Sequence, residues 1–184
     1  MLRTHSENNL LSDPLRILRC FRFVSELNFK IDLRSVDFIK KNKGNLYLAA
    51  KERINYEIQK IVNGANALDA VLLIKKLNIF DTKNLFEDSF FLDLEKINYG
   101  ELDQEEKDKY LPSFFTAQIL DVVTLEKLKF SKADIAKTKL LRKWHLFLKN
   151  KKIAHLYEFD RFKLHQELEM IMPSFIFFLS EMLE

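Results

Sequence analysis

Residues 11–23 read LSDPLRILRCFRF, with an acid beside a proline and then three arginines spaced three residues apart. An Asp followed by Pro is typical of a helix start, because Asp caps the first turn and Pro fits the first helical position. We therefore predict that Asp13 is the N-cap of a helix over residues 14–28. At about 100° per residue, the arginines and Glu26 share one face and apolar side chains occupy the other.

The composition of the whole chain favours the same kind of element. Its 184 residues include 17 Phe but only 3 Gly and 3 Pro. So few helix breakers favour helices joined by short polar loops over a β-sandwich or barrel. The predicted fold class is all-α, with a chain long enough for one compact domain or two small ones.

Hydrophobic spacing and capping residues predict the further helices. Asp32 or Ser35 should cap a short helix that carries Ile39, and Ser131 should cap another helix. The acidic stretch 99–109 is expected to be an exposed connection or a boundary. The remaining predicted helices cover residues 46–62, 66–78, 81–95, 112–128, 132–148, 153–168 and 174–183.

Charge, cysteine content and hydropathy narrow the function classes. The net charge is +3, but residues 127–152 hold ten Lys or Arg against one acid, Asp134. Such a basic stretch can bind a polyanion. Cys20 is the only cysteine, which excludes an intramolecular disulfide and suits a reducing cytosol. No stretch approaches the ~20 apolar residues of a membrane span, and the secretion-signal pattern is missing, so we expect a cytoplasmic protein with no membrane partner.

Two stretches resemble known motifs. DPLRILRCFRF at residues 13–23, continuing to Phe29, resembles the fourth motif of the class II tRNA nucleotidyltransferases, and KERINYEIQKI at residues 51–61 resembles the fifth. That family comprises CCA-adding enzymes, separate CC- and A-adding enzymes and bacterial poly(A) polymerases. The resemblance implies a curved multi-helix array of the family's neck, body and tail type. We expect a nucleotide-selecting neck over 1–63, body helices with the acidic connection over 64–110, and tRNA-binding body and tail helices over 111–184.

Asp13 and Arg16 are the candidate base-reading pair. A carboxylate accepts a hydrogen bond from an exocyclic amine, and a guanidinium donates to a ring acceptor. Cytosine and adenine carry that amine beside a ring nitrogen, whereas guanine and uracil carry a carbonyl there. The resemblance implies that this pair selects the incoming CTP or ATP. Ser12 stands where the family usually has a second acid, which removes one negative charge beside the arginine.

Four further charged residues form a candidate supporting network: Arg19, Glu52, Arg53 and Glu57. Arg19 either points to the ribose or triphosphate, or pairs with Glu52 or Glu57, and Arg53 has the same two alternatives. We expect the two motif helices to pack together, so that this network holds Arg16 in place.

A basic helix is a second candidate site, for RNA: Lys137, Lys139, Arg142 and Lys143. Lys and Arg neutralise phosphates without reading sequence, which fits a protein that accepts many tRNAs. The alternative is an ordinary solvated helix face. Trp144 is expected in the core. The histidines of the C-terminal part are spaced by ten residues with no Cys pair beside them, so no metal site is predicted.

Nucleotide addition requires chemistry that this sequence lacks. Two Mg²⁺ ions held by paired carboxylates would activate the 3′-hydroxyl and stabilise the leaving pyrophosphate. In the family those carboxylates belong to an N-terminal head domain with a Gly-Gly-x-x-Arg-Asp stretch and an Asp-x-Asp pair, and neither pattern occurs here. We therefore expect no catalytic residue and no bound Mg²⁺ in this chain, and no polymerisation by it alone. The chain would be a cut fragment, a truncated product or one part of a split enzyme, with a head domain or companion chain as partner.

The predicted function is the base-selecting and RNA-binding part of an enzyme that adds C and A to the tRNA 3′ end from CTP and ATP. The nearest alternative is a poly(A) polymerase of the same family. An alternative from a different class is a non-catalytic helical module that binds RNA or protein.

Overall fold

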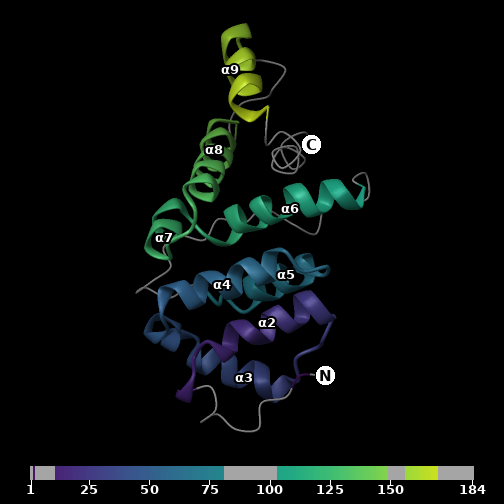
Figure 1. Cartoon of the computed structure of the whole chain (residues 1–184), viewed down its shortest axis with the longest axis vertical. Helices are drawn as coiled ribbons and strands as arrows, with labels where there is room; N and C mark the ends of the chain where they lie inside the picture. Colours follow the sequence, from purple (N-terminus) through teal and green to yellow (C-terminus); the bar gives the residue numbers. More distant parts are fainter. Residues whose placement is uncertain (1, 3–10, 81–102, 149–155, 170–184) are drawn as a thin grey trace.

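The computed structural model describes Leu2 and residues 11–80, 103–148 and 156–169 (Figure 1). Every named element within these residues is a helix, and an isolated bridge between Leu2 and Ile31 is the one β pairing among them. The all-α class predicted from the composition is confirmed. Within the same residues, none of the helices has the length and apolar character needed to cross a bilayer.

The N-terminal half contains α2 (Arg16–Leu27), α3 (Leu33–Asn42), the 3₁₀ helix η1 (Lys43–Leu48), α4 (Lys51–Val62) and α5 (Ala67–Lys76). α2 packs against both α4 and α5, and these two helices also pack on each other. Figure 1 shows α3 on the side of α2 that faces away from α4. The two stretches that resemble family motifs therefore lie in neighbouring helices.

The predicted apolar faces of α2 and α4 meet in the core. Ile17 and Phe21 from α2, and Ile54 and Ile58 from α4, have no exposed surface. Burying each such side chain contributes about 2 kcal/mol to stability. Cys20 lies beside this face, half-buried, and burial raises the pKa of its thiol to about 11.

Ser25 joins α2 to the turn between α4 and α5. Its hydroxyl donates to the Ile61 carbonyl at 2.5 Å, and its own carbonyl accepts from the Asn66 backbone N–H at 2.8 Å. Gly64 lies so close that a Cβ there would be 2.1 Å from Ser25 Oγ. Glycine occupies this position because the crossing leaves no room for a side chain.

The C-terminal half contains α6 (Gln104–Ile119), α7 (Val122–Lys127), α8 (Lys132–Leu148) and α9 (Glu158–Leu168). α6 packs on α4, α5 and α8, while α9 contacts α8. Phe114 and Phe115 of α6 are buried with their ring centroids 5.6 Å apart. Figure 1 shows α8 and α9 extending away from α2–α5, which makes the protein an elongated helical array.

The predicted start of the first helix is wrong by two residues. α2 begins at Arg16, because the chain makes a turn first, in which the Arg16 N–H donates to the Asp13 carbonyl at 3.0 Å. Asp13 Oδ1 accepts from the Leu15 N–H at 3.3 Å, so Asp13 stabilises this turn and is not the N-cap. The predicted end is close to the observed one, since Asn28 follows the helix with a left-handed φ of 52°.

The helix predicted over residues 46–62 begins later than expected. Residues 43–48 form the 3₁₀ helix η1, and Ala49 and Ala50 are extended, with ψ values of 150° and 133°. Leu46 is fully buried, so packing of the 3₁₀ turn overrides the helical spacing of the sequence. The correct start is Lys51.

The acidic stretch is not a connection where the structure describes it. Asp103 begins α6 with a capping box, in which its carboxylate accepts from the Glu106 N–H at 2.8 Å and Glu106 accepts from the Asp103 N–H at 3.2 Å. Pro112 therefore lies inside α6 instead of starting it. The helix predicted over 112–128 is two helices, because Asp121 caps α7.

Other predicted caps are confirmed, and some predicted helices cannot be compared. Asp32 caps α3, and the Asp134 N–H donates to Ser131 Oγ at 3.1 Å at the start of α8. The helix predicted from residue 153 begins at Glu158 in the described residues. Predictions for residues 81–95, 150–152 and 174–183 lie outside the described residues.

Candidate functional site

The packing of α2 on α4 joins the two motifs through an ion pair. Arg53 Nη2 of α4 lies 3.6 Å from Asp13 Oδ2, at the turn before α2. Arg53 is more than half exposed and Asp13 about a quarter, so both remain accessible to a ligand. The expected packing of the two helices is confirmed, but the cation that contacts Asp13 is Arg53.

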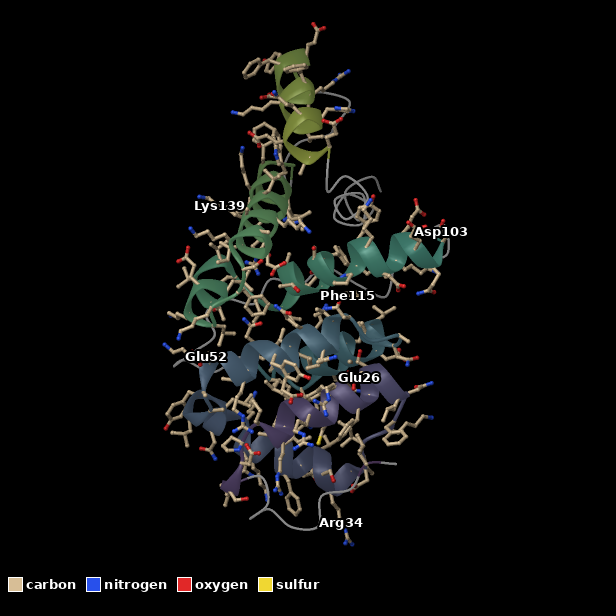
Figure 2. The ribbon with its side chains drawn as sticks, in the orientation of Figure 1. Glu26, Arg34, Glu52, Asp103, Phe115 and Lys139 are labelled. Carbon is tan, nitrogen blue, oxygen red and sulfur yellow. The ribbon has the colours of Figure 1, made fainter. Side chains whose placement is uncertain are left out.

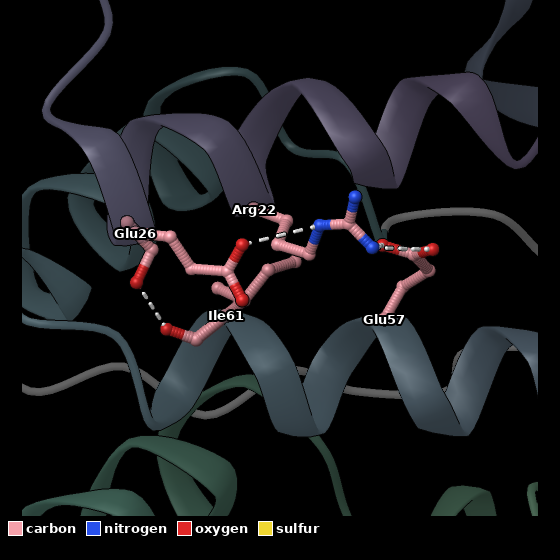
Figure 3. Close-up of polar contacts among 5 residues, drawn as sticks. Arg22, Glu26, Glu57 and Ile61 are labelled. Atoms are coloured by element: carbon pink, nitrogen blue, oxygen red, sulfur yellow. Dashed lines mark hydrogen bonds and ion pairs between the residues drawn. The ribbon is translucent and has the colours of Figure 1, made fainter.

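A second ion pair lies deeper between the same helices. Arg22 Nη1 lies 3.2 Å from Glu57 Oε2, and Arg22 Nε lies 3.4 Å from Glu26 Oε2 (Figure 3). Only 6% of the Glu57 side chain and 16% of the Arg22 side chain are exposed. Burial raises the pKa of Glu57 above its usual range, and the Arg22 charge opposes that rise.

Sequence reasoning did not include Arg22 among the candidate site residues. The available signal was its position on the arginine face of the first helix, next to Phe21 and opposite a motif helix that carries Glu57. A guanidinium at this position becomes buried when the helices pack. It then needs a carboxylate partner, because a buried charge without a partner destabilises the fold.

A pocket of about 340 Å³ opens beside these ion pairs. Three arginines and two glutamates, together with Leu15 and Tyr56, line it: Arg19, Arg22, Arg53, Glu52 and Glu57. Neither Asp13 nor Arg16 is part of the lining. Asp13 approaches the pocket through Arg53, and Arg16 is exposed on the first turn of α2. The lining thus carries one more cation than anion, which suits an anionic ligand.

Glu52 extends the network toward the C-terminal half. It forms an ion pair with Lys129, and the ammonium group lowers the pKa of Glu52. Figure 2 shows Glu52 at the start of α4, on the side that faces α7. No ion pair joins Arg19 to Glu52 or Glu57 among the described residues, although the charge of Arg19 opposes the rise in the pKa of Glu57.

The residues of the basic helix have different surroundings. Arg142 donates from Nε to the Ala117 carbonyl at 3.2 Å and from Nη2 to the Leu120 carbonyl at 3.0 Å, so it ties α8 to the end of α6. Lys143 Nζ lies 2.5 Å from Glu167 Oε2. Lys139 is exposed on α8 (Figure 2), and Lys137 is half-buried.

Trp144 is a core residue, as predicted. Only 3% of it is exposed, and its Nε1–H donates to Glu167 Oε2 at 2.8 Å. Its ring meets that of Phe147 edge-on, with centroids 5.3 Å apart. The contact with Glu167 makes Trp144 part of the joint between α8 and α9.

The carboxylates of the site do not fit a divalent metal ion. Asp13, Glu52 and Glu57 each face a cationic side chain, and the described residues contain no cluster of three potential ligands. Mg²⁺ prefers an octahedron of oxygen ligands, usually with carboxylates that are free to bind it. No step of a mechanism can be assigned to a metal held by these residues.

The chain is similar in sequence to bacterial CCA-adding enzymes, although no protein-family model matches it. It is 30% identical over 96 residues to the CCA-adding enzyme of Staphylococcus aureus strain Mu3, which covers 52% of this chain and 23% of that enzyme. The enzyme of the bovine strain RF122 is 32% identical over 89 residues, with 48% and 22% covered. The match therefore spans less than a quarter of the length of these curated relatives.

Solved structures of CCA-adding enzymes share the fold over nearly the whole chain. An apo form aligns over 97% of this chain and 46% of its own, with a TM-score of 0.65 and 17% identity. The Thermotoga maritima CCA-adding enzyme complexed with tRNA-CCA aligns over 97% and 47%, with a TM-score of 0.63 and 17% identity. The chain is thus related to part of the CCA-adding enzymes in sequence and fold, as its two motifs predict.

Proposed function

We propose that this chain is the base-selecting and RNA-holding part of a tRNA nucleotidyltransferase that adds C and A to the tRNA 3′ end from CTP and ATP. One observation carries the proposal: Arg53 of the second motif holds the Asp13 carboxylate of the first at 3.6 Å, beside a pocket lined by three arginines. The relationship to CCA-adding enzymes supports it.

Asp13 would read the exocyclic amine of the incoming base. Its Oδ1 is bonded to the Leu15 N–H and its Oδ2 pairs with Arg53, which fixes the carboxylate plane. Each carboxylate oxygen has two lone pairs, so one remains on each for the amine of cytosine or adenine. Uracil and guanine would place a carbonyl oxygen against the carboxylate and be repelled.

Arg16 would donate to the ring nitrogen beside that amine. It stands on the first turn of α2, three residues after Asp13, and its side chain is exposed. A guanidinium donates at fixed angles and stacks well, so it recognises a flat base edge better than a lysine would. Ser12 supplies a hydroxyl in place of the usual acid.

The phosphates would bind at the arginines of the pocket. Arg22 is engaged by Glu26 and Glu57, whereas Arg19 has no ion pair within the described residues. We therefore assign Arg19 to the ribose or triphosphate, with Arg53 supporting it. Guanidinium groups bind phosphate oxygens in pairs of charge-assisted hydrogen bonds.

The tRNA would bind along α8, with Lys139 and Lys137 as phosphate contacts. Lys143 can exchange Glu167 for a phosphate, whereas Arg142 keeps α8 attached to α6. We retain residues 1–63 as the neck, 64–110 as body and 111–184 as the tRNA-binding body and tail. Nucleotidyl transfer itself would need Mg²⁺ held by the paired carboxylates of a head domain, and those sequence patterns do not occur in residues 1–184, so we expect these residues alone to be inactive.

The test is to join the chain to the catalytic head of the Staphylococcus aureus CCA-adding enzyme. Each of the four nucleoside triphosphates is offered singly, and then in pairs, with a tRNA that lacks its CCA end. We expect incorporation of C and A only, and we expect Arg16→Ala to admit U or G. Arg34→Ala is the matched control, because Arg34 is exposed on α3 and points away from the other helices (Figure 2).

Two outcomes would contradict the proposal. Runs of A from ATP, with CTP refused, would indicate a poly(A) polymerase. Unchanged selection of C and A in both Asp13→Ala and Arg16→Ala would remove the base-reading role from this pair.

A further inference from the structure

The turn between α7 and α8 has an uncommon backbone. Lys129 has a φ of 58°, in the left-handed region that favours glycine. The Phe130 N–H donates to the Leu125 carbonyl at 3.0 Å, which is the long bond of a Schellman motif. The other left-handed non-glycine residues in the described part are Asn28 and Asn78, and asparagine tolerates this conformation. The presence of a lysine at this left-handed position must therefore be explained by the contacts of its side chain.

Two side chains of α4 bind this turn. Asn55 Nδ2 donates to the Leu128 carbonyl at 3.1 Å and to the Lys129 carbonyl at 3.0 Å. The Lys129 ammonium pairs with the Glu52 carboxylate. Glu52 and Asn55 are three residues apart and so share one face of α4. We call Glu52, Asn55 and Lys129 the latch.

The two latch residues of α4 lie on the turns of that helix that border the pocket. Glu52 itself lines the pocket, as do Arg53 and Tyr56. The geometry points to Asn55 and Lys129 as positioning residues, which hold α4 against the C-terminal helices and thereby set the nucleotide selectivity of the pocket. This inference rests on the proposed function, because it concerns the same site.

The ion pair of the latch adds little to stability. The Lys129 and Glu52 side chains are 65% and 59% exposed, and such exposed pairs stabilise a fold very little. The left-handed backbone of a lysine works against stability. Ser131, two residues on, begins α8, so the proposed tRNA-binding helix is fixed to the same turn that Asn55 holds.

The variant Lys129→Gly distinguishes an effect on nucleotide selectivity from an effect on the stability of the fold. Glycine suits the left-handed backbone, so the chain should fold normally, with a melting temperature within about 2 °C of wild type. In the head-joined protein, we expect the KM for CTP to rise at least about fivefold and the preference for C over U to fall about tenfold, with kcat changed less than about twofold. Asn55→Asp, which removes the donor, should shift both quantities in the same direction.

Two variants serve as controls. Lys129→Arg keeps a cation for Glu52 and should restore KM and selectivity. Lys76→Gln removes a lysine charge that is exposed at the end of α5 and does not line the pocket, and it should leave both unchanged.

The outcomes separate this inference from the proposed function. If the wild type selects C and A and Lys129→Gly does so equally well, the latch has no positioning role and the proposed function stands. If the wild type adds neither C nor A, the proposed function fails and the inference fails with it.

Discussion

Glu57 is the most enclosed charged side chain of the site, and its partner Arg22 approaches from the neighbouring helix at 3.2 Å. Two buried charges of this kind stabilise a fold little as a pair, but each is costly without the other. Glu26 adds a third charge on the solvent side of Arg22. The three residues therefore fix the crossing of α2 and α4, on which the pocket depends.

Arg22→Ala should destabilise the protein by about 3–5 kcal/mol at pH 7, because Glu57 would remain buried without a cation. Chemical denaturation in urea measures the change. Because burial holds the folded-state pKa of Glu57 above its ordinary value of 4.5, the cost is present at pH 7. The destabilisation should become smaller as the pH falls through the folded-state pKa of Glu57 toward 4.5, where Glu57 of the unfolded chain is also protonated. An equal loss at pH 7 and pH 4 would contradict this account.

Gly64→Ala should destabilise the protein by about 1–3 kcal/mol, because the new Cβ would meet the Ser25 side chain and its backbone carbonyl. The closest contact, 2.1 Å to Ser25 Oγ, can be relieved by moving a side chain, but the 2.8 Å contact to the carbonyl carbon cannot. Gly44→Ala is the matched control, since nothing lies within 4 Å of a Cβ there. Equal melting temperatures of the two variants would show that the crossing of α2 over this turn is looser than described.

At the scale of elements, capping residues predicted two helix starts correctly. Asp32 and Ser131 each begin a helix, as their positions in the sequence predict. Residues 103–119 differ from the prediction, because the helix expected to begin at Pro112 begins with the Asp103 capping box nine residues earlier. A helix accepts an interior proline when its start is strongly capped and its apolar end, with Phe114 and Phe115, is buried.

The joint between α8 and α9 should open in acid. Glu167 accepts from Lys143 and from Trp144, and these bonds hold the pKa of Glu167 below its ordinary value of 4.5. A depressed pKa means that the stabilisation is complete above 4.5 and is lost as the pH falls through the lower, folded value. Trp144 is the only tryptophan, so its fluorescence should change with a midpoint below 4.5.

Glu167→Gln tests that assignment. The amide keeps an oxygen for the indole N–H but carries no charge and does not titrate, so the acid transition in fluorescence should disappear. A transition that persists in the variant would have to come from another group.

At the scale of the whole molecule, two sites lie in different halves of an elongated array. The pocket belongs to α2 and α4, whereas Lys137 and Lys139 stand on α8, beyond α7 (Figure 1). α6 connects the halves through its contacts with α4, α5 and α8. An RNA long enough to contact both sites would align its end relative to the pocket.

Binding of tRNA should weaken steeply as salt rises, because each phosphate contact releases counterions. The slope of the logarithm of affinity against that of salt concentration should fall by about 1 for each of Lys137→Gln and Lys139→Gln. Fluorescence anisotropy with a labelled tRNA measures it, and Lys76→Gln, exposed at the end of α5, is the control. An unchanged slope in the α8 variants would exclude this helix as the contact.

The order of residues alone specified the all-α class, the apolar faces of α2 and α4 and the two motifs, because these depend on local spacing and on side-chain type. It could not specify which side chains on different helices form ion pairs. Which arginine contacts Asp13, and that Glu52 pairs with Lys129, 77 residues away, follow only from how α2, α4 and the α7–α8 turn pack. Ion pairs between elements require a distance of a few ångströms, and only the packed chain brings such atoms that close.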